Sequence, residues 1–565
     1  MKKYRLFFTV ILACILIISC TKDEPLSRNA SGTGGIIASG NEQATKAGIT
    51  ILKQGGNAAD ASVATLLALS IKTIGAFCIG GEVPFIYYDA ESGKVTVLNG
   101  QGGAPLDKKA IEWYYENGIP GGDMKSAAVP AVVDLCVTAL KLYGTKSFEE
   151  AVAPSLDILD AGGPNWYRDT GSGDTLRTDR DWYADLAVTF RKLVDAERQK
   201  EGTREEKLLA VSDRFYRGDI ADDLVAWYIE KGGFLRKQDL AAHVTRIEEP
   251  VTADYRGYTI HKCGPWTQGP YLLQTMRLLE GYNLKEMGHA SADYIHTVTE
   301  AMKLGLADRD EYYGDPEYVD VPLEALLSDR YTRIRRSLIK NDKASDKIQP
   351  GDPYRMRALK RGGGRAIKSL GGTTICVVAD KWGNVVAATP SGLSSRAGFG
   401  GTTGVTHGAR LVINNTWKGH PNRIEAGKRP RTTLTPTMVM KDGKPVLAIS
   451  VAGGDMQDIA AIQLISNFVD FGMNLEDTYS ARRFSTRHFI GSFGQGRPRV
   501  NTLRVHESLS ESVINELKKR GHNVTTSRGN VGGVAMLHLE QENGLMHAAG
   551  GRCACINPVQ SEKQE

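Results

Sequence analysis

A pair of threonine hydroxyls, Thr373-Thr374, stands where a loose segment meets a strand-like run. The pair follows Gly371-Gly372 and precedes the apolar residues 375–379. A threonine hydroxyl is a poor nucleophile without a base beside it, so the simplest interpretation of the pair is the start of a strand. The alternative is a nucleophile that becomes available once the chain is opened next to it.

The segment before the pair, residues 345–372, follows neither a helical nor a strand period. Six basic residues are interleaved there with Gly362-Gly363-Gly364, namely Arg355, Arg357, Lys360, Arg361, Arg365 and Lys368. This composition is typical of a solvated linker, which we expect to be mobile and accessible.

Beyond residue 373 the pattern favours strands paired in hairpins. Alternating runs around glycine turns predict hairpins over 374–389, 437–450 and 535–549, a strand over 410–414, and helices over 455–471 and 508–520. Hairpins with helices between them indicate an α+β fold in which helices cover antiparallel sheets, rather than alternating βαβ units.

Before residue 345 the hydrophobic spacing is mainly helical. It predicts helices over 41–54, 57–67, 131–143, 150–161, 292–312 and 323–340, together with a strand over 36–39 and a hairpin over 84–100. The stretch 175–232 is helical in period but highly charged. We expect its helices to lie over a core rather than to form one.

The first twenty residues have the features of a targeting segment. A basic start precedes the apolar residues 6–18, which are too short to span a bilayer comfortably. The run ends in Ile17-Ile18-Ser19-Cys20, which resembles a bacterial lipobox. We expect lipid on Cys20, a polar tether over 21–33, and a protein anchored to the membrane outside the cytoplasm. The alternative is an ordinary secretory signal with a chance cysteine.

Composition excludes several classes of function. The chain has 565 residues, 41% hydrophobic content and a net charge of only +5, which does not suggest a nucleic-acid-binding protein. The cysteines beyond the leader are scattered, so no disulfide framework is indicated. No HExxH, close histidine pair, P-loop or complete dinucleotide fingerprint is present, and we expect neither a metal nor an organic cofactor.

A series of short motifs resembles the γ-glutamyltransferase family of N-terminal nucleophile hydrolases, over about residues 34–557. Motifs similar to that family's large subunit are 55-GGNAADASVA-64, 79-IGGEVPFIYYD-89, 126-SAAVP-130, 254-DYRGY-258 and 307-ADRDEYYGDP-316. Motifs similar to its small subunit are 373-TT-374, 380-DKWGNVVAAT-389, Asn414-Asn415, 428-KRPRTTLTPT-437 and 453-GG-454. Their order along the chain matches as well.

The resemblance implies a four-layer αββα sandwich made from large and small fragments of one precursor, cut autocatalytically between Gly372 and Thr373. The Thr373 hydroxyl would attack the Gly372 carbonyl and form an ester, which water then opens. The freed α-amine of Thr373, with an ordinary pKa of about 8, could then serve as the base for its own hydroxyl. The implied units are a signal peptide 1–20, a tether 21–33, a large-subunit part 34–344, a linker 345–372, a small-subunit part 373–558 and a polar tail 559–565.

Individual roles carry over by position. Thr373 aligns with the nucleophile, and Ser391 with an inner threonine that the family uses to support processing and the nucleophile. Gly453-Gly454 align with the pair whose backbone N–H groups form the oxyanion hole. Thr432-Thr433 stand where the family often has Ser-Ser in the substrate pocket.

Several positions depart from the family pattern. Gln101 replaces the arginine that binds the substrate α-carboxylate, and the run 416–422 lacks the acidic residue that binds the α-amine. Leu393 replaces an asparagine, and Ile375 replaces a histidine. Asp455 replaces a serine, as in the acylase-type branch. A neutral glutamine does not replace a bidentate arginine. Arg396 and Arg431 are the candidates to substitute for it.

We therefore expect a self-processing threonine hydrolase or acyltransferase that cleaves γ-glutamyl or related amide bonds, of the glutathione type, and passes the acyl group to water or an amine. One alternative is an acylase acting on other acyl amides. A second is a lipoprotein that binds a ligand without catalysis. Retention of Thr373, Ser391 and Gly453-Gly454 favours an enzyme.

Overall fold

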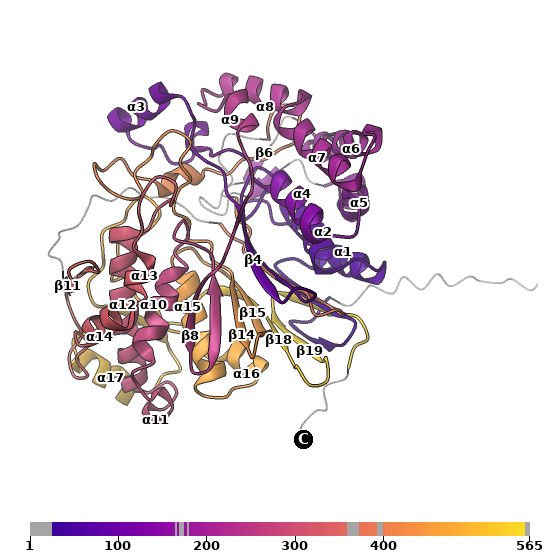
Figure 1. The fold of residues 1–565 in the computed structure, drawn as a ribbon. Helices are drawn as coiled ribbons and strands as arrows, with labels where there is room; N and C mark the ends of the chain where they lie inside the picture. Colours follow the sequence, from indigo (N-terminus) through magenta and orange to yellow (C-terminus); the bar gives the residue numbers. More distant parts are fainter. Residues whose placement is uncertain are drawn as a thin grey trace, which may run out of the picture.

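A computed structural model describes residues 25–163, 166–168, 175–177, 180–358, 372–392 and 399–559. Two seven-stranded sheets lie at its centre, and every neighbouring pair of strands in them is antiparallel (Figure 1). The first sheet has the order β20 (Arg552–Cys555), β2 (Gly35–Ser39), β12 (Cys376–Asp380), β13 (Val385–Ala388), β3 (Val83–Asp89), β4 (Lys94–Gly100) and β7 (Arg246–Glu248). The second has the order β1 (Asn29–Gly32), β19 (Met546–Gly550), β18 (Gly533–Leu539), β15 (Lys444–Ala452), β14 (Thr437–Lys441), β9 (Tyr258–Lys262) and β8 (Val251–Tyr255).

Each sheet mixes strands from both sides of the Gly372–Thr373 bond. In the first sheet β2 lies between β20 and β12, and in the second β14 pairs with β9. A cut at that bond would therefore leave two fragments that share both sheets. They would stay together through the strand ladders and the common core.

The faces that the two sheets turn toward each other form one apolar layer. Ile36, Ile86 and Val377 of the first sheet are buried in the same cluster as Met438 and Leu537 of the second. Neighbouring residues such as Ile37 and Val378 point the other way, into a separate core beneath helices. The strands are thus apolar on both faces, as sheets covered on both sides require.

Helices cover the outer face of each sheet. Against the first sheet lie α1 (Glu42–Lys53), α2 (Ala58–Lys72) and α4 (Val132–Tyr143), and α5 (Phe148–Asp160) packs on α2. Against the second lie α10 (Pro270–Leu279), α15 (Met456–Val469) and α16 (Leu475–Ser480), and α12 (Ala292–Tyr312) packs on α10. Figure 1 shows the two groups on opposite sides of the sheets, which gives the expected αββα sandwich.

Smaller elements complete the described fold. They are α3 (Lys108–Asn117), α9 (Lys237–Ala241), α11 (Leu284–Met287), α13 (Leu323–Leu326), α14 (Asp329–Arg336), α17 (Glu511–Lys519), and the short strand pairs β5–β6 (Trp166–Arg168, Thr175–Arg177), β10–β11 (Gly351–Asp352, Arg357–Ala358) and β16–β17 (Thr502–His506, Asn523–Ser527). In the described part of the chain no helix is both long and apolar enough to cross a membrane.

The helices of the 175–232 stretch correct one expectation. They are α6 (Trp182–Gln199), α7 (Arg204–Tyr216) and α8 (Asp219–Glu230). Far from only lying over a core, they contribute fully buried side chains to it, including Phe190, Phe215 and Leu224. Their charged residues occupy the outer face and hide this apolar stripe when composition alone is considered.

The described residues of the predicted tether 21–33 and of the predicted linker 345–372 include ordered segments, and residues 21–24 and 359–371 lie outside the described part. Residues 29–32, expected in the N-terminal tether, form β1 and pair with β19. The first part of the predicted solvated linker packs against α12. There the Gly351 N–H donates to Asp308 (2.8 Å), and Pro350 and Asp352 are buried.

Residues 410–413 also differ from prediction, because they form a 3₁₀ helix rather than a strand. A short apolar run cannot be assigned to strand or helix from its period alone. The turn matters because it brings Arg410 into the interior, where its side chain is buried.

Candidate active site

Thr373 lies half-buried just before β12, at the junction predicted from the sequence. The next residue fixes it in place, because the Thr374 N–H donates to the Pro390 carbonyl beyond β13 (2.9 Å). At the other end of the hairpin, Asp380 accepts from the Ala58 N–H at the start of α2 (2.8 Å). The Thr373 strand is therefore tied to its neighbouring strand and to a buried helix.

Gly372, on the other side of the bond, has no room for a side chain. A Cβ there would lie 2.4 Å from the Gly75 carbonyl oxygen and 3.0 Å from the Ala76 Cα. Backbone atoms cannot move aside as a flexible side chain can. The bond predicted to be cut is thus pressed against the 75–76 segment, and the close approach requires glycine.

Ser391 contacts that bond directly. Its hydroxyl donates to the Gly372 carbonyl oxygen, and the side chain is fully buried. Two backbone hydrogen bonds join Ser391 to Glu82, with N–O distances of 2.9 and 2.8 Å. The predicted supporting hydroxyl is therefore rigidly held against the carbonyl of the predicted cleavage site.

Behind Ser391 lies a buried ion pair that the sequence did not suggest. Arg410 donates to the Ser391 Oγ (2.5 Å) and forms an ion pair with Glu82, and both charged side chains are buried. Burial raises the pKa of the Glu82 carboxyl, while the positive charge of Arg410 acts in the opposite direction. Glu82 lies within the 79–89 motif, but nothing in the sequence marked Arg410 as a functional residue beyond its place in the predicted strand 410–414.

Gly453 and Gly454 form the turn from β15 into α15. Their φ angles are +146° and +59°, which favour glycine, and their carbonyls accept from Met456 and Gln457. The end of β15 is placed beside the end of β13, because Ser450 donates to the Ala388 carbonyl (2.7 Å). This arrangement is compatible with an oxyanion hole at a helix N-terminus, and that role stays a prediction.

The three predicted pocket residues converge on one segment. Gln101 is buried and donates its amide to the Pro430 carbonyl, two residues before Thr432. Thr432 bonds through its backbone to Trp266 and Gln268 (2.8 and 2.9 Å). The Gln101 Oε1 and Thr433 Oγ1 atoms are buried without a hydrogen-bond partner. Such unpaired groups are what a pocket for a polar ligand would present.

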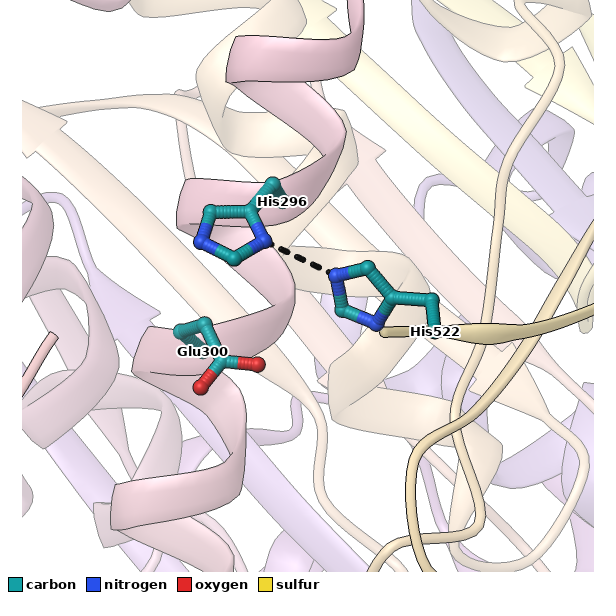
Figure 2. A group of neighbouring side chains, drawn as sticks. All are labelled: His296, Glu300 and His522. Atoms are coloured by element: carbon teal, nitrogen blue, oxygen red, sulfur yellow. Dashed lines mark hydrogen bonds between the residues drawn. The ribbon is translucent and has the colours of Figure 1, made fainter. Parts of the chain in front are cut away.

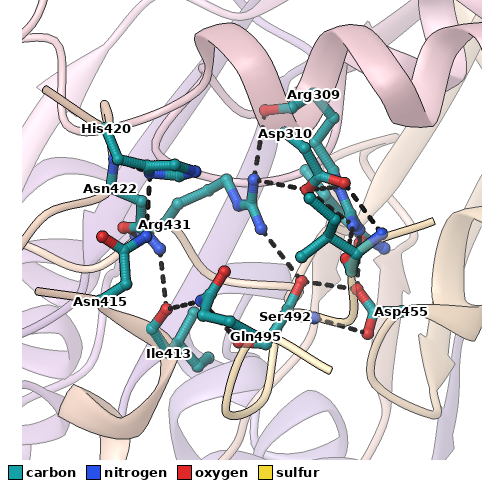
Figure 3. Close-up of polar contacts among 12 residues, drawn as sticks. Arg309, Asp310, Ile413, Asn415, His420, Asn422, Arg431, Asp455, Ser492 and Gln495 are labelled. Carbon is teal, nitrogen blue, oxygen red and sulfur yellow. Dashed lines mark hydrogen bonds and ion pairs between the residues drawn. The ribbon is translucent and has the colours of Figure 1, made fainter. Parts of the chain in front are cut away.

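A cluster of two arginines and two aspartates adjoins this segment (Figure 3). Arg309 reaches Asp455 (2.7 Å) and Asp310 (3.1 Å), while Arg431 contacts Asp310 (3.2 Å) and the Ser492 hydroxyl (3.2 Å). Burial lowers the pKa of Arg431 to about 10, with the charge of Arg309 acting in the same direction. The four charges neutralise one another inside the protein.

This cluster bears on the missing substrate clamp. Arg431, one candidate to replace the family's arginine, already uses both terminal nitrogens within the protein, and only its Nε lacks a partner. The other candidate, Arg396, and the departure at Leu393 lie outside the described residues. The acid-free run 416–422 is a turn in which Asn422 bonds to Ile413 and to the Arg431 N–H (both 2.8 Å).

The fold also assembles a group that sequence spacing could not reveal. His296 and Glu300 of α12 lie beside His522, with 2.9 Å between the His296 Nδ1 and the His522 Nε2 (Figure 2). Glu300 accepts from Lys303 (2.6 Å) and from the Ser345 N–H (3.0 Å), and the His296 Nε2 faces the Lys340 carbonyl (2.6 Å). These contacts explain the group as a buried hydrogen-bonded unit joining α12 to the segment after α17.

An αββα sandwich that places a threonine at the start of a central strand defines the class of N-terminal nucleophile hydrolases. A family model described as Gamma-glutamyltranspeptidase matches residues 44–552, and the chain belongs to that family. It is 30% identical over 540 residues to the glutathione hydrolase proenzyme of Bacillus subtilis (strain 168), covering 91% of this chain and 89% of that protein.

Two further similarities span the same length. The acylase ACY 1 proenzyme of Pseudomonas sp. (strain SE83) is 29% identical over 553 residues, with 92% of each chain covered. A solved structure of LmbA2991 superposes with a TM-score of 0.84 at 30% identity, covering 95% of this chain and all of that one. The chain is thus a self-processing hydrolase of the γ-glutamyltranspeptidase type, with acylases among its relatives.

Proposed function

We propose that this enzyme cleaves amide bonds through an acyl intermediate on Thr373, and that γ-glutamyl compounds of the glutathione type are its acyl donors. Cutting after Gly372 exposes the Thr373 amine, which takes the proton from its own hydroxyl. The observation that carries the proposal is the contact of Ser391 with the Gly372 carbonyl at the entrance to β12. Full-length similarity to glutathione hydrolase proenzymes supports the substrate class.

After attack on a substrate carbonyl, the acyl group passes to water or to an amine. The N–H groups of Gly453 and Gly454 are proposed to stabilise the negative charge on the carbonyl oxygen. Gln101, Thr432 and Thr433 are proposed to contact the acyl chain. We expect no metal and no organic cofactor to take part, since the nucleophile and its base come from one residue.

A second candidate, an acylase acting on other acyl amides, is favoured by one specific feature. Gln101 takes the place of an arginine, and the nearby Arg431 is held by Asp310 and Ser492. The atom of Gln101 without a partner is its acceptor oxygen, and a neutral amide lacks the charge with which an arginine binds a carboxylate. A substrate without an α-carboxylate would fit such a pocket better.

A matched set of p-nitroanilides separates the two candidates. The γ-glutamyl, glutaryl, 4-aminobutanoyl and butanoyl anilides share one acyl length and differ only in the α-amine and α-carboxylate. Highest kcat/KM on the γ-glutamyl compound supports the first proposal. Highest kcat/KM on a compound that lacks the carboxylate supports the acylase. No turnover of any amide by processed protein would contradict both and leave a ligand-binding role.

We further propose that lipid on Cys20 anchors the protein to the membrane outside the cytoplasm of a bacterium. The lipobox-like sequence before Cys20 supports this, and the cysteine lies outside the described residues. Expression of the full chain and of Cys20→Ala, followed by detergent phase partition, tests it. Equal partition of the two proteins into the aqueous phase would contradict the proposal.

A further inference from the structure

The direction in which the Ser391 proton points is determined by its neighbours. A serine hydroxyl has one proton to donate, whereas an arginine guanidinium can only donate. Because Arg410 donates to the Ser391 Oγ, the serine proton is not directed at Arg410. It is directed at the Gly372 carbonyl oxygen, with which the hydroxyl also makes contact.

Glu82 holds this arrangement from two sides. Its carboxylate forms the ion pair with Arg410, and its backbone makes both hydrogen bonds to the backbone of Ser391. The side chains of Glu82 and Arg410 are 3% and 2% exposed, so neither charge can be satisfied by bulk water. In addition, Gly81 passes so close to the Ser391 carbonyl that a Cβ there would lie 2.2 Å from it. Few other positions are open to Ser391.

We propose that Glu82 and Arg410 are positioning residues for self-cleavage, holding Ser391 so that its hydroxyl proton is aimed at the Gly372 carbonyl oxygen. This inference rests on the proposed cleavage between Gly372 and Thr373. Neither residue touches the reacting atoms, and both act through Ser391.

The chemical step shows what the arrangement contributes. The Thr373 Oγ forms a bond to the Gly372 carbonyl carbon, and the carbonyl electron pair moves onto oxygen. The electron pair then re-forms the carbonyl as the peptide C–N bond breaks, which leaves an ester, and the hydroxyl proton of Thr373 ends on the released amine. Water then opens the ester, giving the Gly372 carboxylate and the free Thr373 hydroxyl. As negative charge grows on the carbonyl oxygen, the hydrogen bond from Ser391 strengthens more than in the resting chain. The positive charge of Arg410, one hydrogen bond further away, polarises the serine in the same direction.

The test follows self-cleavage of residues 25–565 made by cell-free synthesis, sampled over time on a denaturing gel. The variants are Arg410→Met, Arg410→Lys, Glu82→Gln, Ser391→Ala and the double variant Arg410→Met/Ser391→Ala. Arg410→Met should slow cleavage by about 10- to 100-fold, as expected for loss of a charge-assisted hydrogen bond. Arg410→Lys should lose less, because it keeps a charged donor.

The double variant distinguishes positioning from a merely structural role. If Arg410 acts through Ser391, the double variant cleaves no more slowly than Ser391→Ala alone. Cleavage of Arg410→Met and Glu82→Gln at the wild-type rate would overturn the inference. A double variant slowed by the full product of the two single effects would also overturn it. Absence of cleavage in the wild type would instead contradict the proposed function itself.

Folding is checked in the uncleavable Thr373→Ala precursor carrying each change, by thermal unfolding. The matched control is Arg256→Met, which removes an ion pair with Asp470 (3.2 Å) at the far end of α15 and should cleave at the wild-type rate. If Arg410→Met lowers the Tm, the cleavage rates of the nearly isosteric Glu82→Gln variant and of the Arg410→Lys variant decide whether the inference holds. Cleavage rates that follow Tm across all variants, the control included, would overturn the inference.

Discussion

Two buried groups of charged residues lie near the predicted active site, and they are used differently. Around the Gly372–Thr373 bond, Glu82 and Arg410 hold a serine whose proton is directed at the bond itself. Around the predicted pocket, Arg309 and Arg431 are directed at Asp310 and Asp455, which belong to the protein. The first group faces the reacting atoms, and the second faces inward.

The difference indicates which properties of the family this chain retains. Thr373 is present, and Ser391, proposed to support it, contacts the carbonyl of the bond that would be cut. The charged side chains near the predicted pocket form ion pairs with one another, so a zwitterionic substrate would need other partners. We therefore expect the cleavage chemistry and the choice of substrate to be separable, so that each can be perturbed without the other.

The largest effect is expected for Thr373→Ala. Removing the hydroxyl should abolish self-cleavage and lower amidase activity by more than about 10³-fold, because both reactions are proposed to start from this oxygen. Gel analysis and anilide hydrolysis measure the two losses. Thr373→Ser is the control and should retain cleavage. Substantial cleavage of the alanine variant would break the assignment of the processing centre.

Arg309→Met tests whether the pocket cluster is structural. It leaves the buried Asp310 and the partly buried Asp455 without their main partner, which should lower the free energy of unfolding by about 3–5 kcal/mol. Urea unfolding of the Thr373→Ala precursor, with and without the change, measures this. In the folded fraction of otherwise wild-type protein, self-cleavage should continue. Unchanged stability combined with lost cleavage would show that this cluster serves cleavage rather than the fold.

Acid should destabilise the whole fold, both charged groups included, because two buried histidines are neutral in the folded protein. Burial lowers the pKa of His407 and of His522 to about 3, well below the unfolded value of about 6.5. Between these values the unfolded chain binds more protons at these two histidines, so their contribution to stability is constant above about pH 6.5 and falls as pH decreases. Each of the two histidines should lower the free energy of unfolding by about 2 kcal/mol at pH 5. A Tm of the Thr373→Ala precursor that stays level from pH 7 to pH 5 would contradict this.

Gly372→Ala should slow self-cleavage, because its new methyl group meets the backbone of Gly75 and Ala76. Overpacking of this kind costs about 1–3 kcal/mol and shifts the carbonyl away from Ser391. A cleavage time course measures the effect. Gly496→Ala is the matched control, since a Cβ there has no atom within 4 Å. Equal rates for the two variants would show that the close approach does not matter.

The smallest effect on stability is expected for Thr433→Val. The Thr433 hydroxyl is buried without a partner, so its loss should change the free energy of unfolding by less than about 0.5 kcal/mol. If the hydroxyl serves the substrate, kcat/KM should fall about 10-fold. Thr432→Val is the comparison for stability alone, since its hydroxyl accepts from the Leu434 N–H (3.3 Å) and its loss should cost about 1 kcal/mol. Unchanged kinetics for Thr433→Val would remove that residue from the pocket.

Much of the fold could be predicted from the sequence, because the hairpins and helices follow clear periods and the motifs occur in the family's order. The failures have physical causes. Residues 29–32 are small and polar, and they become a strand only because β19 offers an unpaired edge. Residues 410–413 are too short for their period to separate strand from helix.

For the candidate site, the sequence singled out Thr373, Ser391 and the segment around Thr432, and their roles stay predictions. Tertiary contacts supplied the other residues. Glu82 and Arg410 are far apart in the chain, and no local sequence pattern predicts their pairing. Arg309 and Asp310 lie within the 307–316 motif, to which the sequence assigns no role. The pairing of His296 with His522 likewise depends on how α12 meets the segment after α17.

Cleavage between Gly372 and Thr373 is the central claim, and one measurement tests it most directly. Intact-mass analysis of residues 25–565, with N-terminal sequencing of the smaller species, identifies the cut to the residue. We expect two species that co-purify under native conditions, the smaller one beginning Thr-Thr-Ile-Cys. A single uncut chain, or a small fragment that begins at any other residue, would contradict the account.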